Sequence, residues 1–286
     1  MYECVREVES GISVKGVLSE LKASTSGYYD WKKRKPSKQA KRQARTKEAI
    51  IEIHEESYQI YGAPKITEIL QTKGHKIAQR TVSKYMYEEG IKAHYIKPYT
   101  TTTRNSDFSV ELKNILNRDF TPDKPDAAWC SDITYIWTHS GFVYLTSIMD
   151  LYSRKIIAWE LLDTLHVDGV LSCIKKAKKN RLLSNPVILH SDRGSQYVSK
   201  DYKDTLGVNF IRSYSRKGNP WDNACIESFH ALIKREWLNK YYFKNITSVR
   251  KAVFEYIEVF YNPKRIHSSL GYQTPKQYEI SYQLSS

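Results

Sequence analysis

Three acidic residues interrupt apolar stretches of the sequence, and together their carboxylates could form a metal site. Asp132 lies inside a strand-like stretch, Asp192 comes just after the apolar run 187–189, and Glu227 lies near the start of a helical pattern. Carboxylates that gather without a compensating cation repel one another, so a cluster of them implies bound metal. Hard oxygen ligands select Mg²⁺ or Mn²⁺. Two such ions can activate water or a 3′-hydroxyl and stabilise the leaving oxygen of a phosphodiester, which is the chemistry we predict for these acids.

The elements around the three acids predict a mixed α/β sheet. The stretches 128–137, 142–150 and 155–162 are rich in β-branched and aromatic residues and predict an antiparallel meander. Alternating helices and strands follow, with strands expected at 186–190 and 208–214 and helices at 167–177, 198–206 and 222–238. If the first and fourth strands are adjacent, Asp132 and Asp192 meet at one edge of the sheet. The last of these helices can then bring Glu227 to them.

The helix predicted at 222–238 has two distinct faces. Its apolar stripe is formed by Ile226, Phe229, Ile233 and Trp237. Glu227 and Lys234 lie on an adjacent face, about 10 Å apart along the axis by the rise per residue. Lys234 then has two interpretations, as a phosphate contact beside the acids or as an ordinary solvated lysine.

Several neighbours of the acids are candidates for supporting roles. Asp222 and Asn223 are placed to cap the helix, and caps beside a metal site can also orient Glu227. Arg193 is a candidate DNA contact, and Gly194 is expected to permit a tight turn.

The charge of the chain points to a polyanionic partner. The formal net charge is +14 over 286 residues, which exceeds what solubility requires and is typical of proteins that bind nucleic acid or an anionic membrane. No apolar run approaches the length of a spanning helix, and the N-terminus lacks the pattern of a signal peptide. Four scattered cysteines have no zinc-site spacing. We therefore expect a cytoplasmic protein that binds DNA.

The basic residues are concentrated near the N-terminus. Between positions 32 and 47, nine of sixteen residues are Lys or Arg and none is acidic. This segment is either a solvated linker or an arm that contacts DNA phosphates, in which case the leading contacts are Lys32, Lys33, Arg34 and Lys35. Residues 1–45 are predicted to form a basic helical arm, with two short helices that form a possible helix-turn-helix.

Residues 46–97 have the pattern of a helix-turn-helix domain. A helix carrying Ile50 and Ile53 is followed by one that starts at Pro64, and a third helix is expected from about 78 to 89. Its outward residues are Gln79, Arg80, Ser83 and Lys84, types that read base edges and phosphates. The same spacing also fits an ordinary three-helix packing unit. Residues 98–122 are predicted to be a linker, and 123–286 the catalytic core with a helical C-terminal segment from about 241.

The motifs around the acids resemble a known family. They are similar to the DDE signature of transposases of the insertion sequence three family, specifically the product of its second reading frame, which resembles retroviral integrases. The 35 positions between Asp192 and Glu227, and a lysine seven residues after the glutamate, fit that family. The segments that carry the resemblance are SDITYI (131–136), HSDRGSQY (190–197), SRKGNPWDNACIESFHALIKRE (215–236), residues 61–93 and YNPKRIHSSLGYQTP (261–275).

The resemblance implies a fold, an activity and partners. It implies an RNase H-like core in which Asp132, Asp192 and Glu227 hold two Mg²⁺ or Mn²⁺ ions, and metal-dependent cleavage at the element's ends followed by strand transfer. In this family the product of an upstream reading frame joins the chain by frameshift fusion. Because two ends must be joined, we also expect at least a dimer.

Two other functions fit parts of the sequence. His190 and Arg193 spell the His-x-x-Arg of a tyrosine recombinase, with Tyr272 or Tyr278 as nucleophile, but the strand-rich stretch from 128 to 162 disfavours that largely helical class. A transcriptional regulator would use the helix-turn-helix to bind an operator and the sheet only to dimerise. That function gives no role to the three acids.

Overall fold

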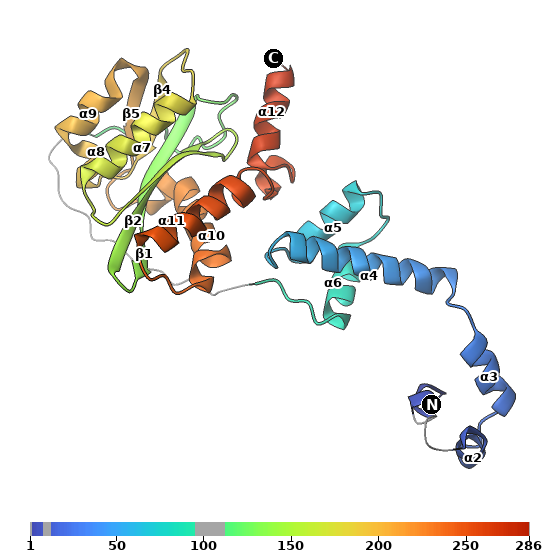
Figure 1. The fold of residues 1–286 in the computed structure, drawn as a ribbon. Coiled ribbons are helices and arrows are strands. Elements are labelled where there is room, and N and C mark those ends of the chain that lie inside the picture. Colours follow the sequence, from blue (N-terminus) through green and yellow to red (C-terminus); the bar gives the residue numbers. More distant parts are fainter. Residues whose placement is uncertain (1, 8–12, 95–111, 286) are drawn as a thin grey trace.

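The strand-rich half of the chain forms one mixed five-stranded sheet, as predicted. The computed structural model describes residues 2–7, 13–94 and 112–285 (Figure 1). The strands β1 (Ala128–Thr138), β2 (Gly141–Asp150) and β3 (Ile156–Leu162) form the antiparallel meander. On the other side of β1 lie two parallel strands, β4 (Val187–Ser191) and β5 (Phe210–Tyr214), so that the order is β3-β2-β1-β4-β5.

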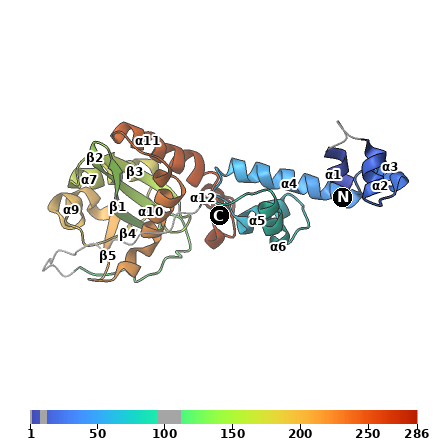
Figure 2. The same ribbon diagram turned by 90° about the horizontal axis from the view of Figure 1, so that it is seen from below.

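Helices cover both faces of this sheet (Figure 2). One face packs against α7 (Val167–Asn180), α8 (Ser195–Val198) and α9 (Lys200–Leu206). The other packs against α10 (Ala224–Glu236) and α11 (Ile246–Phe254), which continues as the π-helical segment η4 (Glu255–Tyr261). Side chains alternate along a strand, so Trp129 of β1 enters the first core and Cys130 the second. Both faces are therefore buried, as in a layered α/β domain.

The remaining helical segments of this half lie between these elements or after them. They are η1 (Gly207–Asn209), η2 (Pro220–Asn223), η3 (Leu238–Lys240), η5 (Ser268–Leu270) and α12 (Pro275–Ser285).

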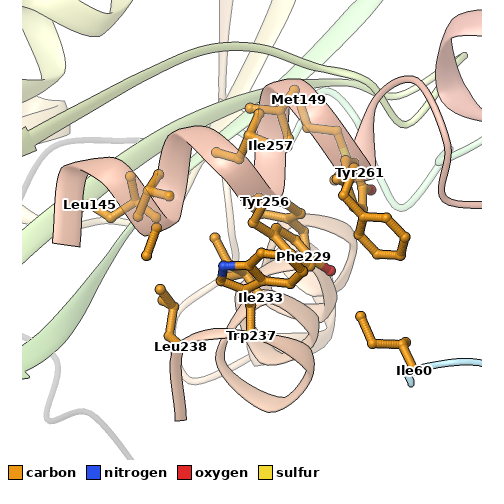
Figure 3. Packing of buried hydrophobic residues seen from close by; sticks show 14 of the residues in the cluster. Ile60, Leu145, Met149, Phe229, Ile233, Trp237, Leu238, Tyr256, Ile257 and Tyr261 are labelled. Atoms are coloured by element: carbon orange, nitrogen blue, oxygen red, sulfur yellow. The ribbon is translucent and has the colours of Figure 1, made fainter. Parts of the chain in front are cut away.

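Aromatic side chains dominate the core between α10 and the sheet (Figure 3). Phe229 and Trp237 come from α10 and its end, Tyr256 and Tyr261 from η4, and all are nearly or fully buried. Leu145, Met149 and other residues of β2 close this core from the sheet side. Each such side chain contributes about 1.5–3 kcal/mol when it is removed from water. This packing, and not any polar contact, therefore supplies most of the energy that holds α10 on the sheet.

A buried ion pair ties the C-terminal segment to α10. Arg265 donates from Nε and Nη2 to the two carboxylate oxygens of Glu236 at 2.8 and 2.6 Å. The hydroxyl of Tyr256 donates to the same carboxylate at 2.7 Å. Burial would raise the pKa of Glu236, but these donors lower it below its usual value. The pair therefore stays ionised inside the protein.

The predicted helix-turn-helix is present as α4 (Lys38–Glu56), α5 (Ala63–Thr72) and α6 (Gln79–Glu88). Pro64 lies in the first turn of α5, as the sequence indicated. The first helix begins earlier than expected, at Lys38, because the side chain of Ser37 caps it by accepting from the Ala40 N–H at 3.1 Å. The boundary that we predicted between residues 45 and 46 thus falls inside α4.

The helix-turn-helix packs directly on the strand-rich half of the chain. The hydroxyl of Tyr61 donates to the Lys264 carbonyl at 3.2 Å and accepts from the Ile266 N–H at 3.0 Å. The ring of Tyr58 lies 4.8 Å from that of Trp237. Buried residues of α4, α5 and α6 belong to the same hydrophobic cluster as α10 and η4. The two halves therefore share one core.

Three short helices at the N-terminus form a separate small cluster. They are α1 (Tyr2–Glu7), α2 (Val14–Glu20) and α3 (Thr25–Lys33), joined through buried Val5, Leu18 and Tyr28. In Figure 1 they lie beyond the first turn of α4. Among the described residues, no helix is long and apolar enough to cross a membrane.

Removing one partner of the buried ion pair should destabilise the protein strongly. We expect Arg265→Met to lower the free energy of unfolding by about 3–5 kcal/mol, because the Glu236 carboxylate is left buried without its cation. The double variant Glu236→Leu/Arg265→Met should recover most of that loss. Urea denaturation measures both. Lys251→Met, which removes a partner of the exposed Lys251–Glu255 pair at 4.0 Å, is the control and should cost less than about 1 kcal/mol. Equal losses for Arg265→Met and this control would contradict the assignment.

Candidate active site

The parallel pairing of β1 with β4 brings the two aspartates together. Cys130 pairs with His190, the last pair of this ladder. Asp132 lies two residues beyond Cys130 and Asp192 two residues beyond His190, so both reach the same level at the carboxyl end of β4. The adjacency of the first and fourth strands that the sequence predicted is confirmed.

Glu227 approaches the same place from α10. The apolar stripe of this helix is buried as predicted, with Ile226, Phe229 and Ile233 at most 1% exposed. Packing of that stripe onto β1 and β2 turns the next face of α10 toward Asp132. His230, one turn after Glu227, has its Nδ1 3.3 Å from Oδ2 of Asp132. The helix therefore presents its acid-bearing first turn to the strand that carries Asp132.

The electrostatics show that the three carboxylates influence one another. Burial, and then the charge of Asp132, raise the pKa of Asp192 to about 6. Burial, followed by the charges of Asp132 and Asp192, raises the pKa of Glu227 to about 7. Asp192 and Glu227 nevertheless have solvent-accessible side chains. The site is thus an open concentration of negative charge.

The donor set is suited to a hard divalent cation, although the side chains are not yet gathered around one point. The three groups offer carboxylate oxygens, the ligands that Mg²⁺ and Mn²⁺ prefer. Within the described residues, no three His, Cys, Asp or Glu side chains lie close enough together to hold a metal ion. The acids are therefore electrostatic neighbours whose side chains have to turn inward to share a cation.

His230 is a site residue that the sequence did not single out. It is buried, and its Nε2 lies 3.3 Å from the Ser147 hydroxyl on β2, opposite Asp132 in the ladder. Its Nδ1 is near Asp132 but is not aligned for a hydrogen bond. The available signal was its position three residues after Glu227, which places both on neighbouring parts of one helix face.

Gly194 allows the chain to turn tightly around Asp192. Its N–H donates to Oδ1 of Asp192 at 2.9 Å. A Cβ added at this position would lie 3.0 Å from the same oxygen and 3.1 Å from Oε1 of Gln196. The glycine is therefore favoured by close approach and not by an unusual φ, because a side chain here would have to displace these two oxygens.

Arg193 and His190 are both held by internal hydrogen bonds. Arg193 donates to the backbone carbonyls of Ser215 and Leu112 at 2.7 and 3.2 Å. The buried ring of His190 lies between the hydroxyls of Ser213 and Ser215 at 2.8 and 3.2 Å, and burial lowers its pKa to about 4. Arg193 thus anchors residue 112 beside the site, and His190 is a neutral strand-end residue.

Asp222 and Asn223 do not cap α10, contrary to the prediction. Asn223 occupies the N-cap position without a capping hydrogen bond. Asp222 is fully buried and accepts from Arg118 at 2.6 Å and from Arg216 at 2.9 Å. Burial would raise its pKa, but these donors hold the pKa well below its usual value. Arg118 reaches this carboxylate from 104 positions away and Arg216 from six positions away, across the turn before η2, and a helix-cap pattern reveals neither contact.

The same contact orders the end of the predicted linker. Residues 95–111 lie outside the described part of the chain, but Asn114 also donates to Asp222 at 2.9 Å, and Leu116 is buried. The backbone N–H groups of Ile115 and Leu116 donate to the Ser213 hydroxyl at 2.9 Å. Residues 112–118 are therefore held against the sheet domain, with Leu116 buried in its core.

Lys234 lies near the acids, as its spacing suggested. Burial lowers its pKa, and the charge of Asp132 partly offsets that effect. Its Nζ lies 4.5 Å from the ring centre of Tyr135 on β1. Lys234 therefore joins the acidic site to the outer part of the β1–β2 hairpin.

The helix-turn-helix exposes the four residues that were predicted to face outward. They are Gln79, Arg80, Ser83 and Lys84, whereas Val82 and Met86 of the same helix are buried. Lys32 and Lys33 end α3, and Arg34 and Lys35 follow it, all with exposed side chains. None of these residues contacts the acids through any interaction recorded among the described residues.

A basic stripe on α4 lies within the basic segment 32–47, although its residues were not among the leading DNA contacts that we predicted. Four exposed residues at i, i+3, i+4 and i+7 form it: Lys38, Lys41, Arg42 and Arg45. With His75 and Thr46 they line a hollow of about 340 Å³. Arg42 donates to the Lys76 carbonyl at 3.0 Å, just before α6 begins. The stripe thus lies beside the first turn of α6, and the charge count of 32–47 was its only sequence signal.

Comparison with family models assigns both halves of the chain. Residues 122–220 and 210–275 match models described as an integrase core domain, and residues 41–99 match a model described as an HTH-like domain. The protein is thus a polynucleotidyl transferase with an integrase catalytic core behind a helix-turn-helix.

Curated relatives define the family. The chain is 36% identical over 247 residues to the transposase for insertion sequence element IS904 of Lactococcus lactis, covering 86% of this chain and 98% of the relative. It is 31% identical over 281 residues to transposase InsF for insertion sequence IS3A of Escherichia coli, covering 97% and 98%. The chain therefore belongs to the IS3 family of insertion-sequence transposases, as its motifs indicated.

One solved structure similar to this chain is the HTLV-2 integrase catalytic core domain in complex with magnesium. The TM-score is 0.42 at 18% identity, covering 55% of this chain and 98% of that chain.

Family membership removes both rival functions. A transposase with an integrase core is an enzyme, so the regulator without catalysis is excluded. A tyrosine recombinase is excluded as well, and His190 and Arg193, its required pair, are both occupied by internal hydrogen bonds.

The raised pKa of Glu227 predicts a pH-dependent effect on stability. Between its ordinary pKa of 4.5 and about 7 the folded chain binds more protons than the unfolded chain, so ionisation of Glu227 lowers stability as pH rises through this window. In metal-free buffer, we expect Glu227→Gln to melt about 2–4 °C above wild type at pH 8, and at the same temperature near pH 4.5. Glu48→Gln, on the exposed side of α4, should change neither value. Equal melting of Glu227→Gln and wild type at pH 8 would show that the three charges do not interact.

Proposed function

We propose that this transposase binds the terminal inverted repeats of its insertion sequence and catalyses Mg²⁺-dependent strand cleavage and strand transfer, with Asp132, Asp192 and Glu227 as catalytic and metal-holding residues. The observation that carries this proposal is the end of the β1–β4 ladder at the pair Cys130–His190. Asp132 and Asp192 each lie two residues beyond that pair, so they are at the same level on adjacent strands. Family membership supports the reaction class. The raised pKa values of Asp192 and Glu227, caused by burial and then by the neighbouring acids, support the joint role.

The metal requirement follows from the same acids. Two divalent cations held by the three carboxylates would polarise the scissile phosphodiester and favour ionisation of the attacking oxygen. The chain's own contribution is to hold three carboxylates within electrostatic reach of each other and to fix Asp192 through the Gly194 N–H. His230 packs beside Asp132 from the α10 side, with Nδ1 3.3 Å from Oδ2.

The proposed DNA contacts fall into three groups: base-reading residues, phosphate-binding surfaces, and residues near the reacting strand. Gln79, Arg80, Ser83 and Lys84 on α6 are proposed to read base edges of the terminal repeats. Two exposed basic surfaces are proposed to hold phosphates. One is Lys32 to Lys35, at the end of α3, and the other is the stripe on α4, which lies beside α6. Lys234 and Arg193 are proposed to act near the reacting strand, Lys234 directly and Arg193 by anchoring residue 112.

The assembly is proposed from the reaction. Two element ends have to be joined, so at least two copies of the chain are needed, together with the upstream reading frame product that the family uses. The DNA partner implies action on the bacterial nucleoid, in the cytoplasm. The predicted division of the chain at 45/46, 97/98 and 122/123 also stays a proposal, with the first boundary crossed by α4.

The triad is tested by cleavage of labelled element ends in Mg²⁺. We expect Asp132→Asn, Asp192→Asn and Glu227→Gln each to lower the cleavage rate more than about 100-fold, because loss of residues that merely orient metal ligands already costs up to that factor. Binding of the same DNA should persist. The matched control is Asp201→Asn, an exposed aspartate of α9. If the three variants cut as fast as this control, the acids are not the catalytic residues.

The phosphate-binding stripe on α4 and the base-reading residues of α6 can be distinguished by how DNA binding depends on salt and on DNA sequence. Alanine at Lys41 or Arg45 should weaken binding to all duplexes and reduce the slope of log K against log salt by about one each. Arg80→Ala should instead lose about 1–3 kcal/mol of preference for the terminal repeat over unrelated DNA. Lys175→Ala, exposed on α7, is the control for a general change of charge. An unchanged salt slope for Lys41→Ala would exclude the stripe from the DNA surface.

A further inference from the structure

An exposed aromatic cluster lies on the outer part of the β1–β2 hairpin and has no role in the site described above. It consists of Tyr135 and Trp137 on β1 and Phe142 on β2, with 46%, 63% and 46% of their surface exposed. Trp137 and Phe142 are paired across the ladder, with ring centres 5.0 Å apart, and Tyr135 lies 5.4 Å from Phe142. The three rings therefore form one continuous surface, here called the hairpin aromatic surface.

Lys234 links this surface to the acids. Lys234 lies over Tyr135 at 4.5 Å and is close enough to Asp132 for that charge to affect its pKa. Tyr135 is three residues after Asp132 on β1, so the two side chains point to opposite faces of the sheet, and Lys234 is the residue that is near both. The β1–β4 ladder ends at Cys130, so this part of β1 extends past β4 and its edge on that side is not covered by β4.

Lysines and further aromatic residues lie around the hairpin aromatic surface. The backbone N–H of His139, at the hairpin turn, donates to the Phe243 carbonyl at 3.0 Å, and the Ser140 hydroxyl donates to the Lys244 carbonyl at 2.9 Å. These contacts place the segment KYYFK (240–244) against the turn, with Tyr241 51% and Tyr242 95% exposed. From Ile133 to Met149 and from Trp237 to Lys244 the sequence contains no acidic residue.

We propose that the hairpin aromatic surface binds unpaired DNA bases by stacking, next to the phosphodiester that reacts at the acids. Aromatic rings interleaved with lysines are the composition of surfaces that bind single-stranded nucleic acid, because rings stack on bases while cations meet the phosphates. A duplex hides its base faces, so the ligand is a strand that is already separated. Protein interfaces are depleted of charge at their centre, whereas Lys234 lies directly on a ring of this surface.

The proposal rests on the proposed function in taking DNA as the substrate, but its test needs no cleavage. The probe is a fluorescein-labelled oligothymidylate of about 16 nucleotides, titrated by fluorescence anisotropy against the full chain. A duplex of the same length is titrated in parallel. Measurements at raised salt weaken the contribution of the N-terminal basic surfaces and leave stacking in place.

We expect Trp137→Ala to weaken binding of the single strand about 10-fold or more, since loss of one stacking ring costs on the order of 1–3 kcal/mol. Trp137→Phe should bind within about 3-fold of wild type, and duplex binding should be the same for all three proteins. Because Trp137 is mostly exposed, all three should melt alike, and Phe142→Ala provides a second, independent loss of a ring. Wild-type single-strand affinity in both alanine variants would overturn the proposal. So would an equal loss for single strand and duplex, or a change in oligomeric state caused by Trp137→Ala, which would make this surface a contact between copies. Absence of cleavage by the wild type would contradict the proposed function and leave these affinities as they are.

Discussion

The short parallel ladder between β1 and β4 is the constraint on which the rest of the structure depends. It contains three residue pairs and ends at Cys130 and His190. Because it ends there, Asp192 leaves the sheet at the level of Asp132, and the outer half of β1 is free to extend with β2 as a hairpin. A longer ladder would draw Asp192 into the hydrogen-bonded sheet, where the Gly194 turn could not form. The acidic site and the open aromatic hairpin thus have one structural cause.

Two acids five residues apart show how neighbours decide the role of a carboxylate. Asp222 is buried but meets Arg118 and Arg216, so its pKa is lowered and it holds residues 112–118 on the core. Glu227 is more open, but burial and then the charges of Asp132 and Asp192 raise its pKa. Charge of one sign without a partner is unfavourable in a folded chain unless something else binds there. The aromatic core beneath α10 supplies the stability that tolerates this concentration of charge.

Patterns of local periodicity were enough to predict the sheet, both flanking helix layers and the adjacency of the two strands that carry Asp132 and Asp192. Strand stretches were read correctly because apolar and β-branched runs are bounded by turns, and the α10 stripe because its spacing is regular. Most of the wrong predictions concern contacts outside a helix or strand pattern. Asp222 was predicted as a cap but instead accepts from Arg118, 104 positions away, and from Arg216. His230 was missed because its partners are on other strands, and α4 starts early because Ser37 caps it.

The C-terminal segment around Arg265 joins the helix-turn-helix to α10, the helix that carries Glu227. Tyr61 of the helix-turn-helix is hydrogen-bonded to the backbone on both sides of Arg265, at Lys264 and Ile266. Arg265 in turn holds Glu236, at the end of the helix that begins near Glu227. A helix is stiff over this length, so a displacement of the helix-turn-helix would have to break the buried pair or move α10 with it. The position of α6, where we propose that DNA binds, is thereby coupled to the position of the acids by side chains that belong to neither site.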